Sequence, residues 1–71
     1  MSHESIEILV NGERKKIAGN PSISELLREL HVASDRVAVE MNKAIVRKAD
    51  WASTVVSPGA ELEIVQFVGG G

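Results

Sequence analysis

Residues 61–67 read ELEIVQF and are followed by VGGG at positions 68–71. The first part alternates polar and apolar side chains and closes on Phe67, a pattern typical of a β-strand with one buried face. The three glycines at positions 69–71 carry no side chains and lose much backbone entropy on ordering, so we expect a flexible C-terminal tail. From Val68 onward this thread can extend roughly 13 Å, a length that suits the active-site channel of a partner. A frayed terminus is the alternative interpretation.

Length, composition and charge set the class of protein. Seventy-one residues suffice for one small domain, expected at residues 1–68, with the tail at residues 69–71. There is no cysteine, and the two histidines lack metal-ligand spacing, so no metal site is expected. The formal net charge of −2 argues against a nucleic-acid partner. No apolar run approaches the ~20 residues that span a bilayer, so we expect a cytoplasmic protein without a membrane partner.

The N-terminal part of the chain predicts a β-hairpin followed by a helix. Asn-Gly at positions 11–12 is a strong hairpin signal between the alternating residues 6–10 and a more polar strand at residues 13–18, expected at a sheet edge. Ser22 and Glu25 form the pattern of a capping box, which starts a helix. The apolar side chains of this helix fall on one face: Ile23, Leu26, Leu27 and Leu30.

The remaining elements complete a sheet around that helix. Residues 37–41 and 44–47 predict two short strands, and Asp50 is expected to cap one helical turn over residues 51–53. We expect Trp51 to pack at the bottom of the core with its N–H bonded to a carbonyl. The first and last strands should lie side by side and parallel at the centre of a mixed sheet. The fold class is therefore α+β, with the helix on one face of the sheet.

The sequence contains no recognisable catalytic constellation, since no serine has a suggestive histidine and acid partner. The terminal carboxylate remains as the reactive group. A carboxylate is a poor electrophile because its charge repels nucleophiles, but coupling to an adenylate supplies a good leaving group. We therefore expect a protein co-substrate modified by other enzymes, and not an enzyme.

A docking surface is expected on the open face of the sheet. If the inward side chains of the first and last strands face the helix, then Leu9, Val65 and Phe67 point away from it. Parallel neighbouring strands would place these three close together beside the tail. An exposed apolar patch there suits docking on a partner. A second small cluster closed by loops is the alternative.

Several motifs of the chain occur in a fixed order: Asn11-Gly12, Met41-Asn42, Ile45-Val46-Arg47 followed by Trp51, Gly59, and Glu63-Ile64-Val65 running into the terminal glycines. Together they resemble the ThiS family, the ubiquitin-like sulfur carriers of thiamine (thiazole) biosynthesis. The Arg47-to-Trp51 spacing combined with the terminal diglycine is the most specific part, and the resemblance covers nearly the whole chain from Ile6. It implies a β-grasp fold of four to five strands packed on one main helix.

The resemblance also implies a role for each terminal glycine. Gly71 would be adenylated with ATP by a ubiquitin-activating-like enzyme and converted to a thiocarboxylate with sulfur from a cysteine desulfurase or another donor. Gly69 and Gly70 would enter the partner's channel, and thiazole synthase would take the sulfur. The protein itself would bind no cofactor. The extra glycine at position 69 and the extension at residues 1–5 depart from the family pattern.

Three other interpretations stay open on the sequence. The small subunit of molybdopterin synthase uses the same tail chemistry, although the Trp51 region and the chain length favour ThiS. A ubiquitin-like modifier would form isopeptides with lysines of its targets. A β-grasp binding module with an inert tail would carry no sulfur at all.

Overall fold

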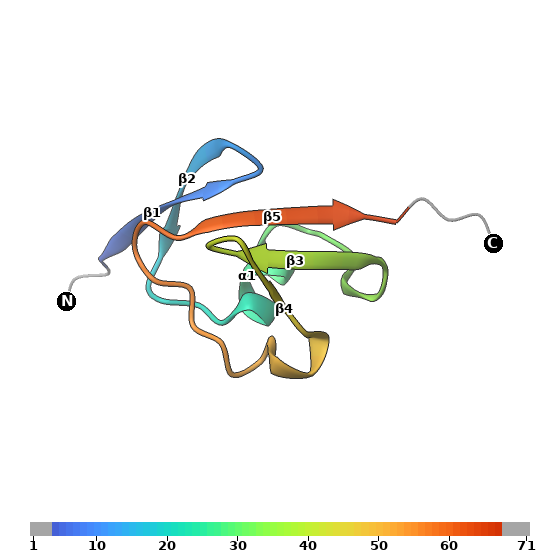
Figure 1. Cartoon of the computed structure of the whole chain (residues 1–71). Coiled ribbons are helices and arrows are strands. Elements are labelled where there is room, and N and C mark those ends of the chain that lie inside the picture. The colour runs from blue at the N-terminus through green and yellow to red at the C-terminus, as the bar shows by residue number, and fades with distance from the viewer. Residues whose placement is uncertain (1–3, 68–71) are drawn as a thin grey trace.

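A computed structural model describes residues 4–67, and its centre is a five-stranded mixed sheet with one helix packed on one face (Figure 1). The strands are β1 (Ser5–Val10), β2 (Glu13–Ala18), β3 (Val37–Met41), β4 (Ala44–Val46) and β5 (Glu61–Gln66). The helix is α1 (Ile23–Glu29), and the short 3-10 helices are η1 (Ser34–Arg36) and η2 (Lys48–Asp50).

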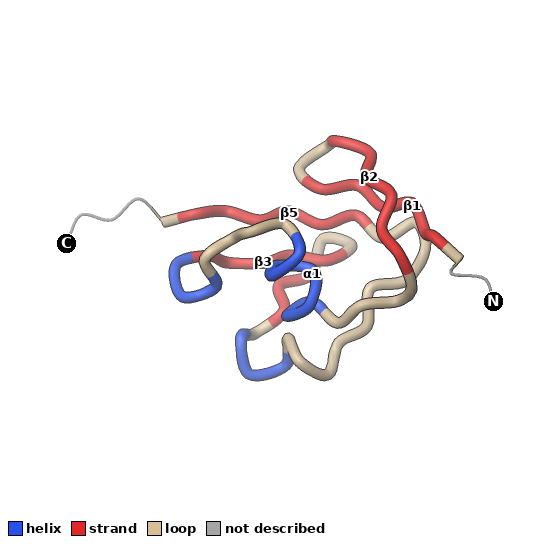
Figure 2. The backbone as a smooth tube through the Cα atoms, turned by 180° about the vertical axis from the view of Figure 1, so that it is seen from behind, coloured by secondary structure: helices blue, strands red, loops and turns tan. Residues whose placement is uncertain are grey.

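The order of the strands is β2-β1-β5-β3-β4, with β1 and β5 parallel and every other neighbouring pair antiparallel. The predicted α+β architecture is therefore confirmed, including the parallel first and last strands and the edge position of β2. Helix α1 lies behind the sheet in Figure 1 and in front of it in Figure 2, which shows the molecule from the other side.

Two tight turns of the same kind close the two hairpins. Asn11 and Gly12 have φ angles of 52° and 85°, and Asn42 and Lys43 have φ angles of 53° and 71°. Positive φ at both central residues defines the type I′ turn, whose twist matches that of the flanking strands. The Asn-Gly signal in the sequence thus predicted the β1–β2 hairpin correctly.

Helix α1 begins at the predicted capping box. The Glu25 amide donates to the Ser22 hydroxyl oxygen at 3.1 Å, and the Ser22 amide donates to the Glu25 carboxylate at 2.9 Å. The helix ends at Glu29, and His31 then adopts a left-handed φ of 60°, which turns the chain toward β3. The predicted helix end near His31 is confirmed.

The core lies between α1 and the inner face of the sheet, and Trp51 closes it at one end. The indole is only 4% exposed, and its Nε1 donates to the Val46 carbonyl at 2.9 Å, as predicted. The expected cap by the Asp50 side chain is wrong. The helical turn occurs earlier, at Lys48–Asp50, because the Asp50 amide bonds the Arg47 carbonyl. The Asp50 carbonyl, not its carboxylate, accepts hydrogen bonds from the next two hydroxyl side chains.

Replacing Trp51 by alanine should lower the free energy of unfolding by about 3–5 kcal/mol, because it removes a buried ring and leaves a cavity. Trp51→Phe should cost less, since it keeps an apolar ring, although that ring is smaller than the indole and lacks the N–H donor to the Val46 carbonyl. Chemical denaturation of both variants measures the difference. An unchanged midpoint for Trp51→Ala would show that the indole contributes nothing to the core.

Candidate functional site

Strand β5 leads the chain out of the fold toward its C-terminus (Figure 1). On one side it pairs with β3 along most of its length, from Met41↔Leu62 to Val37↔Gln66. On the other side it pairs with β1 only at Leu9↔Glu61 and Val10↔Leu62. The second half of β5 therefore runs past the end of β1.

Side chains of the two turn asparagines take over where backbone pairing stops. Asn11 Oδ1 accepts the Ile64 amide at 2.8 Å, and Asn11 Nδ2 donates to the Ile64 carbonyl at 3.2 Å. Asn42 Oδ1 accepts the Glu61 amide at 3.0 Å, at the start of the same strand. The sequence alone indicates only turn geometry for Asn11, since its partner lies 53 residues away and depends on strand register.

The structure separates the three residues that were expected to form one docking patch. Val65 and Phe67 are exposed, by 55% and 57%, as predicted for side chains that point away from the helix. Leu9 is half-buried and pairs with Glu61, four residues before Val65, which is roughly 13 Å along a strand. The expected proximity of Leu9 to the other two is therefore wrong, because the register places the end of β1 beside the start of β5.

The neighbours of Val65 on this surface come from β3 and β4 instead. Val65 pairs with Ala38, and the next outward pair along β5 is Glu63 with Glu40. Glu40 in turn pairs with Ile45, which is 71% exposed. We call the surface formed by Glu40, Ile45, Glu63, Val65 and Phe67 the outer face.

The outer face combines exposed apolar groups with repelling charges. Glu40 and Glu63 stand directly opposite each other on adjacent strands, an arrangement that destabilises a sheet. The only ion pair within residues 4–67 joins Lys15 and Glu13 at 3.7 Å, away from these carboxylates. The two glutamates thus carry a negative charge that no salt bridge in the described region neutralises.

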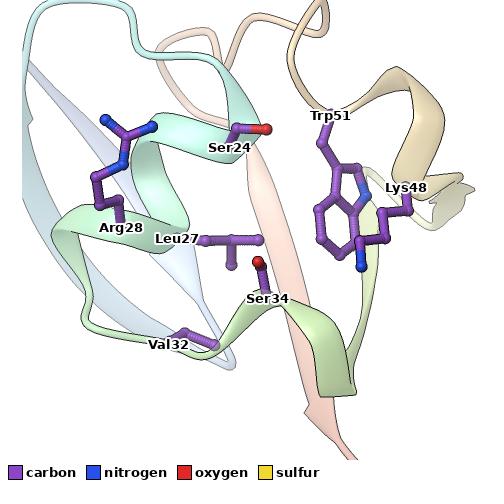
Figure 3. A pocket seen from close by; sticks show the side chains of 7 residues that line it. All are labelled: Ser24, Leu27, Arg28, Val32, Ser34, Lys48 and Trp51. Atoms are coloured by element: carbon purple, nitrogen blue, oxygen red, sulfur yellow. The ribbon is translucent and has the colours of Figure 1, made fainter.

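A shallow pocket of about 370 Å³ lies on the helical side of the molecule (Figure 3). The residues that line it are Ser24, Leu27, Arg28, Val32, Ser34, Lys48 and Trp51. The hydroxyl of Ser24 faces the indole, whereas the guanidinium of Arg28 turns away from it. No histidine or carboxylate lines the pocket, so neither hydroxyl has a general base there.

Neither a metal centre nor a membrane span is found in the part of the chain that the structure describes. No group of three or more His, Asp or Glu side chains there could hold a metal ion. None of its helices is long and apolar enough to cross a membrane. Gly69, Gly70 and Gly71 lie outside the described residues, so their predicted roles stay predictions.

Comparisons with known proteins place these features in a family. The family model of the ThiS family matches residues 8–71. A thiazole synthase of Paramagnetospirillum magneticum is 42% identical over 93% of this chain, which spans only about a fifth (20%) of that relative's length. The sulfur carrier protein ThiS of Escherichia coli is 29% identical over 93% of this chain and 100% of its own.

A solved structure agrees with the family match. The crystal structure of the thiamine biosynthesis protein ThiS from Geobacter metallireducens superposes with a TM-score of 0.82 at 32% identity, covering 93% of this chain and all (100%) of that one. The strand order and the single main helix are those of the ubiquitin-like β-grasp fold. The chain belongs to the ThiS family.

Proposed function

We propose that this protein carries sulfur for thiazole formation in thiamine biosynthesis, as a thiocarboxylate at the carboxyl group of Gly71. The observation that carries the proposal is the family match, which extends over residues 8–71 and so includes the terminal glycines. The names of the Escherichia coli and Geobacter metallireducens relatives support sulfur carriage and thiamine biosynthesis, respectively.

The proposed chemistry takes place on enzymes that bind this chain. A terminal carboxylate oxygen attacks the α-phosphate of ATP on a ubiquitin-activating-like enzyme, and pyrophosphate leaves. A sulfur nucleophile from a cysteine desulfurase or another donor then attacks the acyl carbon and displaces AMP. Where that nucleophile is a persulfide, the product is an acyl disulfide, and a thiol then reduces its S–S bond, releasing the thiocarboxylate and forming a disulfide with the donor cysteine. The chain acts as a co-substrate in the cytoplasm, binds no cofactor of its own, and presents Gly69 and Gly70 to the channel.

Thiazole synthase is the proposed acceptor of the sulfur. In the Paramagnetospirillum magneticum relative, the segment that matches this chain makes up a fifth (20%) of a polypeptide named thiazole synthase. A second such relative, from Magnetococcus marinus, is 35% identical over the same share of its length. Sharing one polypeptide raises the effective concentration of a carrier and its acceptor, so this arrangement supports a direct transfer between them.

We propose the outer face as the surface that docks on these enzymes. Val65 on β5 and Phe67, the first residue after this strand, are large exposed apolar side chains near the C-terminus. Burial of such groups in a partner's pocket is the usual source of binding energy. The adjacent Glu40 and Glu63 favour a partner that surrounds that pocket with arginine or lysine. Leu9 lies at the margin of this surface and is not an anchor of it.

Deletion of Gly71 tests the carrier proposal. The deletion moves the terminal carboxylate about 3.5 Å toward the fold, and misplacement near 1 Å can already slow catalysis by about 10²-fold. We expect the replacement of oxygen by sulfur, followed by mass spectrometry with ATP, the adenylating enzyme and a sulfur donor, to slow at least that much. Gly70→Ala should slow it less. A truncated protein that reacts as fast as the parent would contradict the mechanism.

Val65→Asp tests the docking surface, because it adds a third negative charge beside Glu40 and Glu63 and removes an apolar anchor. We expect the affinity for the adenylating enzyme to fall by about tenfold or more in calorimetric titration. Val55→Asp is the matched control: Val55 is 53% exposed and bridges Ser22 at the start of α1, away from the outer face. Equal affinities for the two variants would reject the outer face as the docking surface.

A further inference from the structure

We infer that Asn11 is a positioning residue that fixes the C-terminal half of β5 and thereby the direction in which the chain leaves the fold. The inference rests on the proposed function, since it concerns how the carrier's terminus is presented to the adenylating enzyme. Asn11 would then act on the far end of the sequence through its contacts with Ile64, which the turn itself does not require.

Asn11 lies at the point where β5 loses its parallel neighbour. β1 ends at Val10, opposite Leu62. One residue later, the Asn11 backbone amide donates to the Leu62 carbonyl at 2.8 Å. The Asn11 side chain then both accepts from and donates to the backbone of Ile64. One turn residue therefore prolongs the β1 edge by one more pair of hydrogen bonds, as a backbone neighbour would.

Beyond Ile64, the same side of β5 has no further hydrogen-bonding neighbour in the described chain. The Phe67 amide donates to the Arg36 carbonyl at 2.8 Å. Because hydrogen-bonded and non-hydrogen-bonded pairs alternate along an antiparallel ladder, the adjacent pair, Val37 with Gln66, directs the Gln66 peptide groups away from β3. They point to the side that β1 no longer covers. Within residues 4–67, the Asn11 side chain is thus the last group that holds β5 on this side.

The residue type at position 11 suits both the turn and the contact with Ile64. A φ of 52° in a type I′ turn favours asparagine, aspartate or glycine. Of these three, only asparagine offers both a donor and an acceptor to the peptide groups of Ile64. Asn42 has nearly the same φ, 53°, in the other I′ turn, and its side chain holds Glu61 at the opposite end of β5. The chain therefore contains its own matched control.

The experiment compares Asn11→Gly with Asn42→Gly. Both variants keep a turn that accepts positive φ, and both lose the side-chain amide with the same gain in backbone freedom. We expect the Ile64 amide to exchange its hydrogen faster in Asn11→Gly and at the parental rate in Asn42→Gly. In ATP–pyrophosphate exchange with the adenylating enzyme, Asn11→Gly should raise the KM for the carrier about tenfold and leave kcat unchanged. A tenfold rise in KM corresponds to the entropy cost of ordering the backbone of about one more residue on docking.

Asn11→Asp completes the series, because it keeps the acceptor for the Ile64 amide and the turn but loses the donor. Its KM should lie between those of the parent and Asn11→Gly. A KM for Asn11→Gly equal to that of Asn42→Gly would overturn the positioning role, and so would a loss confined to kcat. A parent protein that supports no exchange at all would instead count against the proposed function.

Discussion

The position of β5 between β1 and β3 is the constraint on which the rest of this fold depends. This strand joins the two hairpins into one sheet, because β1 and β3 are linked in the sheet only through it. Backbone and side-chain hydrogen bonds hold β5 at its start and on the side that faces β1. Backbone pairing with β1 covers its first residues, and the side-chain amides of Asn11 and Asn42 bind Ile64 and Glu61. The hairpin turns thus secure a strand that is distant from them in sequence.

The alternation of side chains along β5 lets one strand serve the core and the surface at once. Leu62 is 1% exposed and belongs to the core beneath α1, whereas Val65 is 55% exposed on the outer face. The opposed carboxylates of Glu40 and Glu63 cost stability in the free protein. A partner that places arginine or lysine beside Glu40 and Glu63 would relieve this repulsion on docking.

Local signals predicted most of the fold, and long-range register explains what they missed. The Asn-Gly turn, the capping box and the alternation of β1 and β5 each depend on residues close in sequence, and the structure contains all of them. The register between two strands is set by the packing of the whole core and not by local signals. The prediction therefore puts Leu9 beside Val65, whereas in the structure it pairs with Glu61. The contact between Asn11 and Ile64 depends on the same register. For the site, the exposure of Val65 and Phe67 was predicted correctly, while Gly71 lies outside the described residues.

Sulfur carriage by the carboxyl group of Gly71 is tested most directly by the intact mass of the protein isolated from cells of its own host that are actively making thiamine. The account predicts a fraction whose mass is raised by the exchange of one oxygen for one sulfur, located by fragmentation at the C-terminal glycine. The same protein from cells that lack the adenylating enzyme should show only the unmodified mass. Finding no sulfur at the terminus in producing cells would contradict the account.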